Sequence, residues 1–195
     1  MSEIEPVPAA TVVLLRQSPV GEELEVLLLQ RNSRLVFHGG HWVFPGGRID
    51  KRDFQSAGSE LEYPAALKAA VRETREEAGI GINESQLIHI AHWTTPPKLP
   101  RRFCTWFFVY PVFDPVTVLV DNDEILDHRW ISPSNAIADA QEDRWVLPGP
   151  TLTTLSDIAD YKTLDDLIAA VTVRKIRVFP KNSQYYRPSE MGLPK

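Results

Sequence analysis

The sequence predicts an α/β fold in which strands and helices alternate. Apolar segments of strand length recur along the chain, and amphipathic segments of helix length separate them. The 195 residues include 43% hydrophobic residues, which is enough for one α/β domain with a buried core. We therefore expect residues 1–195 to form a single domain, with an extended tail from about residue 173, where prolines become frequent.

Two strands and a glycine turn are expected in the first quarter of the chain. Residues 9–15 and 24–30 are rich in leucine and β-branched residues, and the sequence Ser-Pro-Val-Gly-Glu at 18–22 is typical of a turn between them. Residues 42–47 (Trp-Val-Phe-Pro-Gly-Gly) predict a short apolar strand that ends in a proline-fixed turn. The paired glycines allow the backbone to approach a ligand closely.

A helix with an acidic stripe is expected to end at Gly79, a residue type that commonly follows a helix C-terminus. At about 100° per residue, Glu73, Glu76 and Glu77 fall within one narrow arc. The core-facing residues are expected roughly 140° away, and they are Leu67, Val71, Thr74 and Ala78. Like charges gathered in this way destabilise a helix unless a cation joins them. The pattern favours a cation site, and the alternative is an ordinary exposed acidic helix.

Three strands and two helices are expected after the acidic helix. The strands are predicted from alternating or aromatic-rich runs at residues 86–93, 103–113 and 125–131. One helix begins after Ser132, with Ser132 as its N-cap and Pro133 in its first turn. A further amphipathic helix is predicted over residues 163–171.

Composition and charge exclude several classes of protein. The net charge of −5 disfavours a general nucleic-acid binder, whose affinity depends on an excess of lysine and arginine. No apolar run approaches the length of a membrane span, and the N-terminus lacks the pattern of a secretion signal. We therefore expect a cytoplasmic protein that does not act on nucleic acid or membranes. Cys104, the single cysteine, lies in an apolar run and is expected to be a buried thiol.

The glycine segment and the acidic helix together resemble the signature of the Nudix hydrolases, Gly-x5-Glu-x7-Arg-Glu-U-x-Glu-Glu-x-Gly-U, where U is a bulky aliphatic residue. The second half is present as Arg-Glu-Thr-Arg-Glu-Glu-Ala-Gly-Ile at residues 72–80, with threonine at one aliphatic position. Gly47 precedes Arg72 by 25 positions instead of 14, which implies an insertion of 11 residues between Asp50 and Tyr63. Glu60 and Glu62 are the two candidates for the upstream glutamate that braces the arginine.

The resemblance implies a mixed, curved sheet between helices, an α/β/α sandwich, and a pyrophosphohydrolase that depends on Mg²⁺ or Mn²⁺. Such an enzyme cleaves a diphosphate linkage in a nucleoside diphosphate derivative with a metal-activated water. The metal ligands it implies are Glu73, Glu76, Glu77, the carbonyl of Gly46 and, from a later acidic loop, Glu124. The catalytic group is expected to comprise Glu76 as base, Glu73 and Arg72.

The substrate is expected from two basic segments that resemble the coenzyme A diphosphatase branch of the family. Arg31 and Arg34 precede the glycines, and Arg101 and Arg102 follow the prolines of the segment 93–103. Guanidinium groups bind phosphates well, and surface ion pairs are the alternative role. Coenzyme A or acyl-coenzyme A is the expected substrate. The alternatives are an ADP-ribose or NADH pyrophosphatase and a non-catalytic Nudix-fold module that senses nucleotides or binds a protein. Both a monomer and a homodimer remain open.

Overall fold

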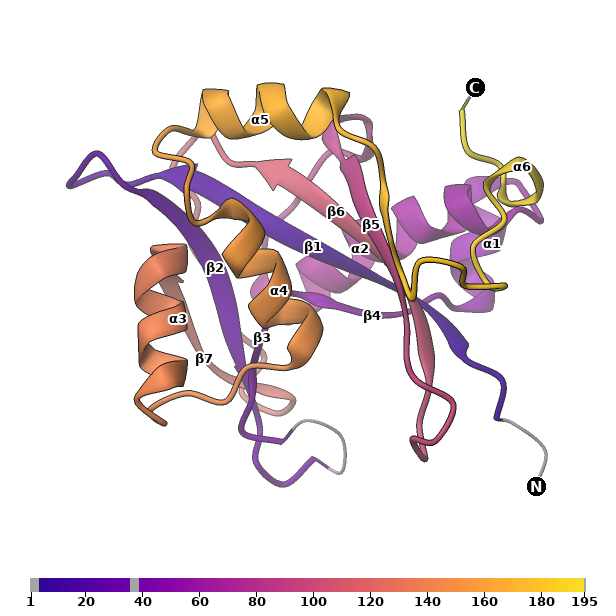
Figure 1. Cartoon of the computed structure of the whole chain (residues 1–195), viewed down its shortest axis with the longest axis horizontal. Helices are drawn as coiled ribbons and strands as arrows, with labels where there is room; N and C mark the ends of the chain where they lie inside the picture. The colour runs from indigo at the N-terminus through magenta and orange to yellow at the C-terminus, as the bar shows by residue number, and fades with distance from the viewer. Residues whose placement is uncertain (1–3, 36–38, 195) are drawn as a thin grey trace.

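The computed structural model describes residues 4–35 and 39–194, and it places a mixed sheet between two groups of helices (Figure 1). The strands are β1 (Val7–Gln17), β2 (Leu24–Arg31), β3 (Trp42–Val43), β4 (Gly46–Arg48), β5 (Ile88–Thr94), β6 (Phe103–Pro111), β7 (Ile125–Ile131) and β8 (Arg177–Phe179). The helices are α1 (Lys51–Ala57), α2 (Glu62–Ala78), α3 (Pro133–Gln141), α4 (Gly149–Ile158), α5 (Leu164–Val173) and α6 (Pro188–Met191), with a short 3₁₀ turn, η1, at Glu84–Gln86. This arrangement confirms the predicted α/β/α class.

The sheet has eight strands and splits at β1. The path is β3-β2-β1-β6-β5-β8, with β7 paired to β2 and β4 paired to β1. Strand β1 pairs with β2 over Leu15–Gln17 and with β4 over Ala9–Thr11, both antiparallel, and it runs parallel to β6. Strand β4 therefore occupies the edge of β1 from which β2 has diverged. This split brings Gly46 and Gly47 beside α2.

Two hydrophobic cores lie on the two faces of the sheet. One core joins α2 and α6 to the sheet, and the other joins α3, α4 and α5 to it. In α2 the buried face is made by Ala65, Ala66, Ala69, Ala70, Thr74, Glu77 and Ala78. Leu67 and Val71 are half-buried and pack against the same core, so the predicted core face is confirmed, and the alanines widen it. Alanine side chains are short, so the backbone of α2 packs close to β1 and β4, which brings its glutamates near the glycines.

The structure confirms most predicted elements, corrects two of them and adds others that were not predicted. Gly46 and Gly47 lie in strand β4 instead of a turn. The tail after residue 173 is not simply extended, because it contains β8, which pairs parallel with β5, and α6. Helices α1 and α4 were not predicted. Ser132 caps α3 and Gly79 ends α2 in the left-handed conformation, both as expected. Cys104 is buried, and burial raises the pKa of its thiol to about 12.

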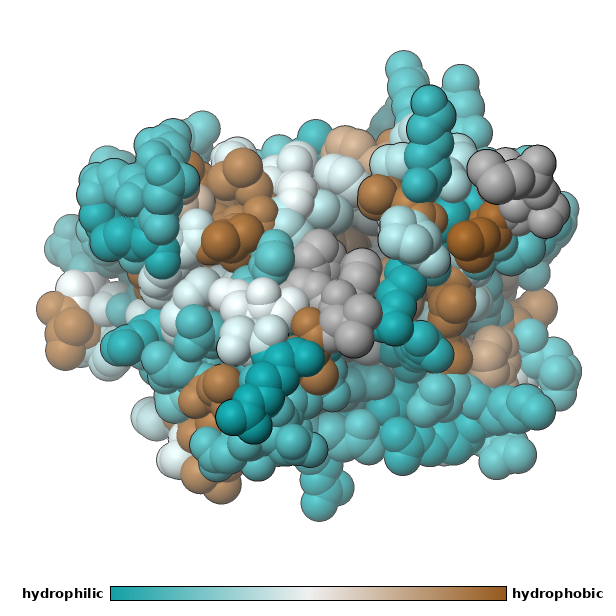
Figure 2. Space-filling view, turned by 90° about the horizontal axis from the view of Figure 1, so that it is seen from below, coloured by the Kyte–Doolittle hydropathy of each residue, from teal (hydrophilic) through white to brown (hydrophobic). Residues whose placement is uncertain are grey.

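The surface shows no continuous apolar patch on the underside formed by the described residues. In Figure 2 the hydrophobic side chains on this face form separate groups among hydrophilic ones. A large homodimer interface would need a broad apolar area. Figure 2 shows one face of the molecule only, and a homodimer stays a prediction. Within residues 4–35 and 39–194, no helix combines the length and the apolar character that a bilayer crossing requires.

Candidate active site

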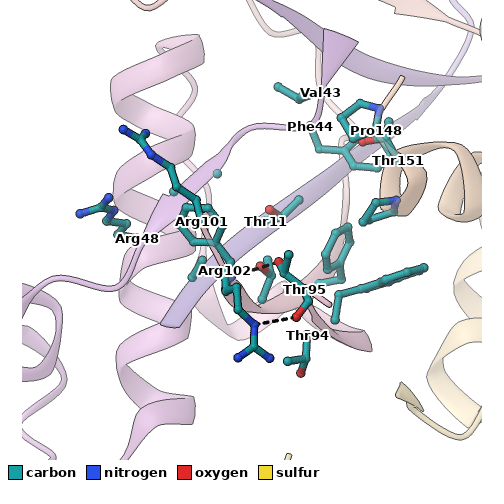
Figure 3. A pocket seen from close by; sticks show the side chains of 18 of the residues that line it. Thr11, Val43, Phe44, Arg48, Thr94, Thr95, Arg101, Arg102, Pro148 and Thr151 are labelled. Carbon is teal, nitrogen blue, oxygen red and sulfur yellow. Dashed lines mark hydrogen bonds between the residues drawn. The ribbon is translucent and has the colours of Figure 1, made fainter. Parts of the chain in front are cut away.

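A cleft of about 1630 Å³ opens beside the split in the sheet. Its walls come from β1, β4, α2, the edges of β5 and β6, the loop 95–102, the start of α4 and the tail residues 180–185. Figure 3 shows part of this lining, including Thr11, Phe44, Arg48, Arg101 and Thr151. Four glutamates predicted as metal ligands line the same cleft: Glu73, Glu76, Glu77 and Glu124. The fold thus brings the acidic helix, the glycine strand and the later acidic loop together.

Glu77 is the buried carboxylate of this group, with 4% of the residue exposed. Its Oε2 accepts a hydrogen bond of 2.8 Å from the backbone N–H of Gly46, and its Oε1 lies 3.7 Å from Nη1 of Arg31. Burial raises the pKa of Glu77 to about 8, and the nearby charge of Glu73 acts in the same direction. Ionised Glu77 is therefore costly in this position unless a cation neutralises it.

Glu73 lies directly against strand β4. A Cβ atom at Gly47 would be 2.5 Å from the Glu73 carboxylate carbon and from its Oε1. Only a glycine leaves room for this side chain, which explains the second glycine better than the turn we expected. Burial raises the pKa of Glu73, while the hydrogen bond from Nη1 of Arg72, 2.7 Å long, lowers it.

Arg72 is braced by Asp53, so the expectation that Glu60 or Glu62 holds it was wrong. Nε and Nη2 of Arg72 donate to the two carboxylate oxygens of Asp53 at 3.0 and 2.9 Å. Glu62 instead accepts a hydrogen bond from Trp106 Nε1. Asp53 is six residues after Gly47, which is the signature spacing with aspartate in place of glutamate. Counting forward from the glycine would have found it, and the inserted residues lie between Asp53 and Arg72.

Replacing Asp53 with alanine is expected to lower the free energy of unfolding by about 3 kcal/mol, because it leaves the guanidinium of Arg72 without its buried partner. Asp53 is 2% exposed and also accepts a hydrogen bond from the backbone N–H of Asp50 at the start of α1. Urea unfolding measures the change. The matched control, Glu60→Ala, removes an exposed carboxylate and should cost under about 0.5 kcal/mol. Equal losses in the two variants would show that Asp53 does not brace Arg72.

Glu76 and Glu124 are the two more exposed carboxylates of the cleft. Glu76 accepts a hydrogen bond of 2.9 Å from Arg72 Nη1 and lies 3.2 Å from Arg52 Nη2. Glu124 pairs with Arg31 Nη2 at 2.6 Å. Within the part of the chain that the structure describes, no three acidic, histidine or cysteine side chains converge in a geometry that could hold a metal ion. The glutamates are instead paired with arginines, which supply the compensating charge.

The donor set nevertheless fits a hard dication. All four side chains offer carboxylate oxygens, which Mg²⁺ and Mn²⁺ prefer, and no thiolate or imidazole lies among them. Glu77 is buried with a raised pKa, so the protein stabilises its charged form poorly without an added cation. The chemistry of these four carboxylates therefore suits a hard dication.

The four predicted substrate arginines differ in their surroundings. Arg101 lines the cleft and is exposed, and Arg31 lines it while paired with Glu124. Arg34 is exposed and does not line the cleft, contrary to expectation. Arg102 is in the wall but 3% exposed, and its Nε donates to Thr95 O (Figure 3). Its Nη1 donates to Ile4 O. Its contacts give Arg102 a structural role, which differs from the predicted substrate role.

Arg48 is a cleft residue that the sequence did not single out. It follows Gly47 at the end of β4 and is exposed. Among the described residues, the guanidinium groups of Arg48 and Arg101 make neither an ion pair nor a hydrogen bond, whereas those of Arg31, Arg52, Arg72 and Arg102 are all engaged. Both are therefore available to an anionic ligand. The signal in the sequence was weak, because a single arginine after two glycines is common at a surface.

Most of the sequence matches a family model. Residues 5–149 match the model of the NUDIX domain. They include all elements from β1 to α3 and the four glutamates of the cleft. This chain belongs to the Nudix family. The match extends the resemblance seen in the glycine segment and the acidic helix to most of the chain.

Relatives and solved structures agree with the Nudix assignment. The chain is 24% identical over 168 residues to a Caenorhabditis elegans protein named "Peroxisomal coenzyme A diphosphatase ndx-8", covering 84% of this chain and 65% of that one. It is 22% identical to the Xenopus laevis protein named "Acyl-coenzyme A diphosphatase NUDT19" over a gapped alignment of 245 positions, which covers 79% of this chain and 64% of that one. The chain thus spans less than two thirds of the curated relatives it matches. The crystal structure of a Nudix hydrolase from Alicyclobacillus acidocaldarius superimposes with a TM-score of 0.77 at 20% identity, covering 88% and 99%.

Proposed function

We propose that this Nudix protein is a pyrophosphohydrolase that cleaves a diphosphate linkage in a nucleoside diphosphate derivative. The observation that carries the proposal is the cleft in which Glu73, Glu76 and Glu77 of α2 face strand β4 and the loop carboxylate of Glu124. A purely structural helix would expose these charges to solvent, whereas here Glu77 is buried and Glu73 fits against Gly47. The relatives named as diphosphatases support the same reaction class.

The proposed cofactor is Mg²⁺ or Mn²⁺, held by Glu73, Glu76, Glu77 and Glu124 together with the carbonyl of Gly46. When bound, such an ion neutralises phosphate oxygens and lowers the pKa of a coordinated water. Asp53 and Arg72 position this group, because Arg72 contacts Glu73 at 2.7 Å and Glu76 at 2.9 Å. Magnesium accepts carboxylates spaced along a helix, since it retains several waters of its own.

The chemistry assigned to the protein is a proton transfer and the orientation of the diphosphate. Water attacks one phosphorus and forms a new P–O bond, the bond between that same phosphorus and the bridging oxygen breaks, and the bridging oxygen leaves with the other phosphate. Glu76 is the proposed base that takes the proton of the attacking water, because its side chain is 47% exposed at the cleft and reaches solvent. Glu77, which is buried, and Glu73, which is half-buried, are better suited to bind the cation.

Coenzyme A or acyl-coenzyme A is the proposed substrate. Coenzyme A carries a phosphomonoester in addition to its diphosphate, and the guanidinium groups of Arg48 and Arg101, which have no partner within residues 4–35 and 39–194, suit an extra phosphate. The cleft is also large enough for a ligand longer than a nucleotide, and it includes apolar walls from Phe44, Phe107 and Phe179. The names of the two diphosphatase relatives favour the same substrate.

The test is a panel of coenzyme A, acyl-coenzyme A, ADP-ribose, NADH, dinucleoside polyphosphates and nucleoside triphosphates, incubated with protein and Mg²⁺ or Mn²⁺. Mass spectrometry of the products is expected to show 4′-phosphopantetheine from coenzyme A. A preference for ADP-ribose or NADH would overturn the substrate while leaving the reaction class. Absence of metal-dependent cleavage across the panel would favour a non-catalytic Nudix-fold module that binds nucleotides or proteins.

A further inference from the structure

The first turn of α4 opens into the cleft with unsatisfied backbone donors. Its N-cap residue is Pro148, whose side chain makes no capping hydrogen bond, and the first turn contains no acidic residue. The N–H of Leu152 donates to the carbonyl of Pro148 at 2.9 Å, and Pro150 has no N–H. The N–H groups of Gly149 and Thr151 have no acceptor among the contacts of the described residues. These donors and the partial positive charge of the helix start are therefore free.

The other long helices of the described chain satisfy or neutralise their first turns. Ser132 caps α3, and Thr163 caps α5, which also carries Asp165 and Asp166 in its first turn. Asp50 and Asp53 form a capping box at α1. Helix α2 lacks a side-chain cap but has Glu62 in its first turn. Helix α4 contrasts with all four, although this contrast alone does not make a binding site.

The hydroxyl of Thr151 supplies the second observation. Thr151 is 4% exposed, lines the cleft, and its hydroxyl makes no hydrogen bond among the described residues. In Figure 3 Thr151 lies next to Phe44 and Pro148 at the cleft wall. The hydroxyl oxygen of Thr151 is not among the side-chain atoms that are sealed from solvent without a partner, so it reaches the cleft and can donate to a ligand there.

Space for such a ligand is present in front of the helix. Gly149 lines the cleft, and a Cβ atom built on it would meet no atom within 4 Å. The neighbouring lining residues Val43 and Phe44 are apolar, so water competes less strongly for the donors there. Open space, two backbone N–H groups and one hydroxyl are therefore present within three residues at the cleft wall.

We propose that the start of α4 binds an oxyanion of the ligand, a carboxylate or a phosphate group, through Gly149 N–H, Thr151 N–H and the Thr151 hydroxyl. Helix N-termini bind such anions through their free N–H groups and dipole. Because Pro148 to Thr151 line the same cleft as the glutamates, this group belongs to the part of the substrate that extends beyond the scissile diphosphate. This proposal does not depend on which diphosphate is cleaved, because no glutamate of α2 takes part in the subsite.

The experiment is an NMR titration of the metal-free full chain with two probes, sodium acetate and inorganic phosphate, following the backbone amide signals. The Gly149 and Thr151 amides are expected to shift saturably, with Kd in the millimolar range, and the probe that binds more tightly identifies the group. Thr151→Val, which exchanges the hydroxyl for a methyl, should raise Kd at least threefold, and Thr151→Ser should restore it. The capped start of α5, at Leu164 and Asp166, provides the internal control and should not shift.

The outcomes separate this subsite from the proposed hydrolysis. If neither probe produces a saturable shift at Gly149 and Thr151, or if Thr151→Val and wild type have the same Kd, the subsite proposal is overturned. The result does not depend on turnover of any diphosphate. A failure of the substrate panel would leave these amide shifts as they are, and a failure of the titration would leave the hydrolase proposal intact.

Discussion

Glu77→Gln is expected to lower kcat roughly 1000-fold, equivalent to about 4 kcal/mol of transition-state stabilisation, without unfolding the protein. Glutamine keeps the shape of the side chain and its acceptor for the Gly46 N–H, which is 2.8 Å from Oε2 of Glu77. It cannot supply the negative charge that the proposed cation needs. Steady-state hydrolysis of the best substrate from the panel, at saturating Mg²⁺, measures the loss.

The stability of the metal-free protein provides an independent check on Glu77. Burial raises the pKa of this carboxyl from 4.5 to about 8, so the folded protein holds its proton more tightly than the unfolded chain does. The resulting stabilisation is complete below pH 4.5 and is lost as the pH rises through 8. Glutamine does not ionise, so urea unfolding in EDTA at pH 9 should find the variant more stable than wild type. The difference should disappear at pH 4.5.

A surface control isolates the effect of position from that of charge. Glu84→Gln removes a carboxylate that pairs with Lys68 at 2.6 Å outside the acidic cleft, and it should leave kcat within twofold of wild type. If Glu77→Gln were equally active, the assignment of the acidic helix as the metal-binding element would be wrong.

The sequence predicted the central elements because their patterns are local. Strands β1, β2, β6 and β7 and the end of α2 follow from runs of apolar residues bounded by turn residues or Gly79. The acidic arc of α2 follows from helical spacing alone. Its buried face was less predictable, because alanines take part in a core only when a neighbouring strand packs close, which depends on the tertiary fold.

The missed elements depend on contacts or on ambiguous residues. The segment that opens α4, Leu-Pro-Gly-Pro, resembles a turn, yet proline is tolerated in a first turn because its missing N–H would be unpaired there. Strand β8 has three residues and gains its hydrogen bonds from β5, far away in the sequence. At α1 the sequence did contain a readable signal, the capping pair Asp50 and Asp53.

The candidate site was predicted unevenly for a related reason. The three glutamates of α2 stand in one continuous segment, so their proximity required only helical geometry. Asp53, which braces Arg72, was missed because counting backward from Arg72 crosses the inserted residues. The burial of Arg102 depends on its contact with Ile4, 98 positions away, and no spacing rule in the sequence reveals such a contact.

Gly47→Ala is expected to reduce kcat about 100-fold while the fold is retained, because the added methyl would displace a proposed metal ligand. The new Cβ would lie 2.5 Å from Glu73 Oε1 and 2.7 Å from Oε2, which is the far end of a side chain that has room to rotate into the cleft. The backbone of β4 is not obstructed. Kinetics with thermal unfolding of the same preparation measures both effects, and full activity would show that the position of Glu73 against β4 is unimportant.

Alanine substitutions at two other glycines, Gly46 and Gly81, are the controls for Gly47→Ala. Gly46→Ala would place its Cβ 2.4 Å from the carbonyl oxygen of Ala10 and 2.8 Å from Cα of Thr11, so strand pairing itself must shift. That variant should lose stability as well as activity, by at least about 2 kcal/mol. Gly81→Ala, where the added Cβ meets nothing within 4 Å, should change neither. Loss of activity without loss of stability at Gly47 alone would therefore tie the second glycine to the Glu73 carboxylate and the first to the sheet.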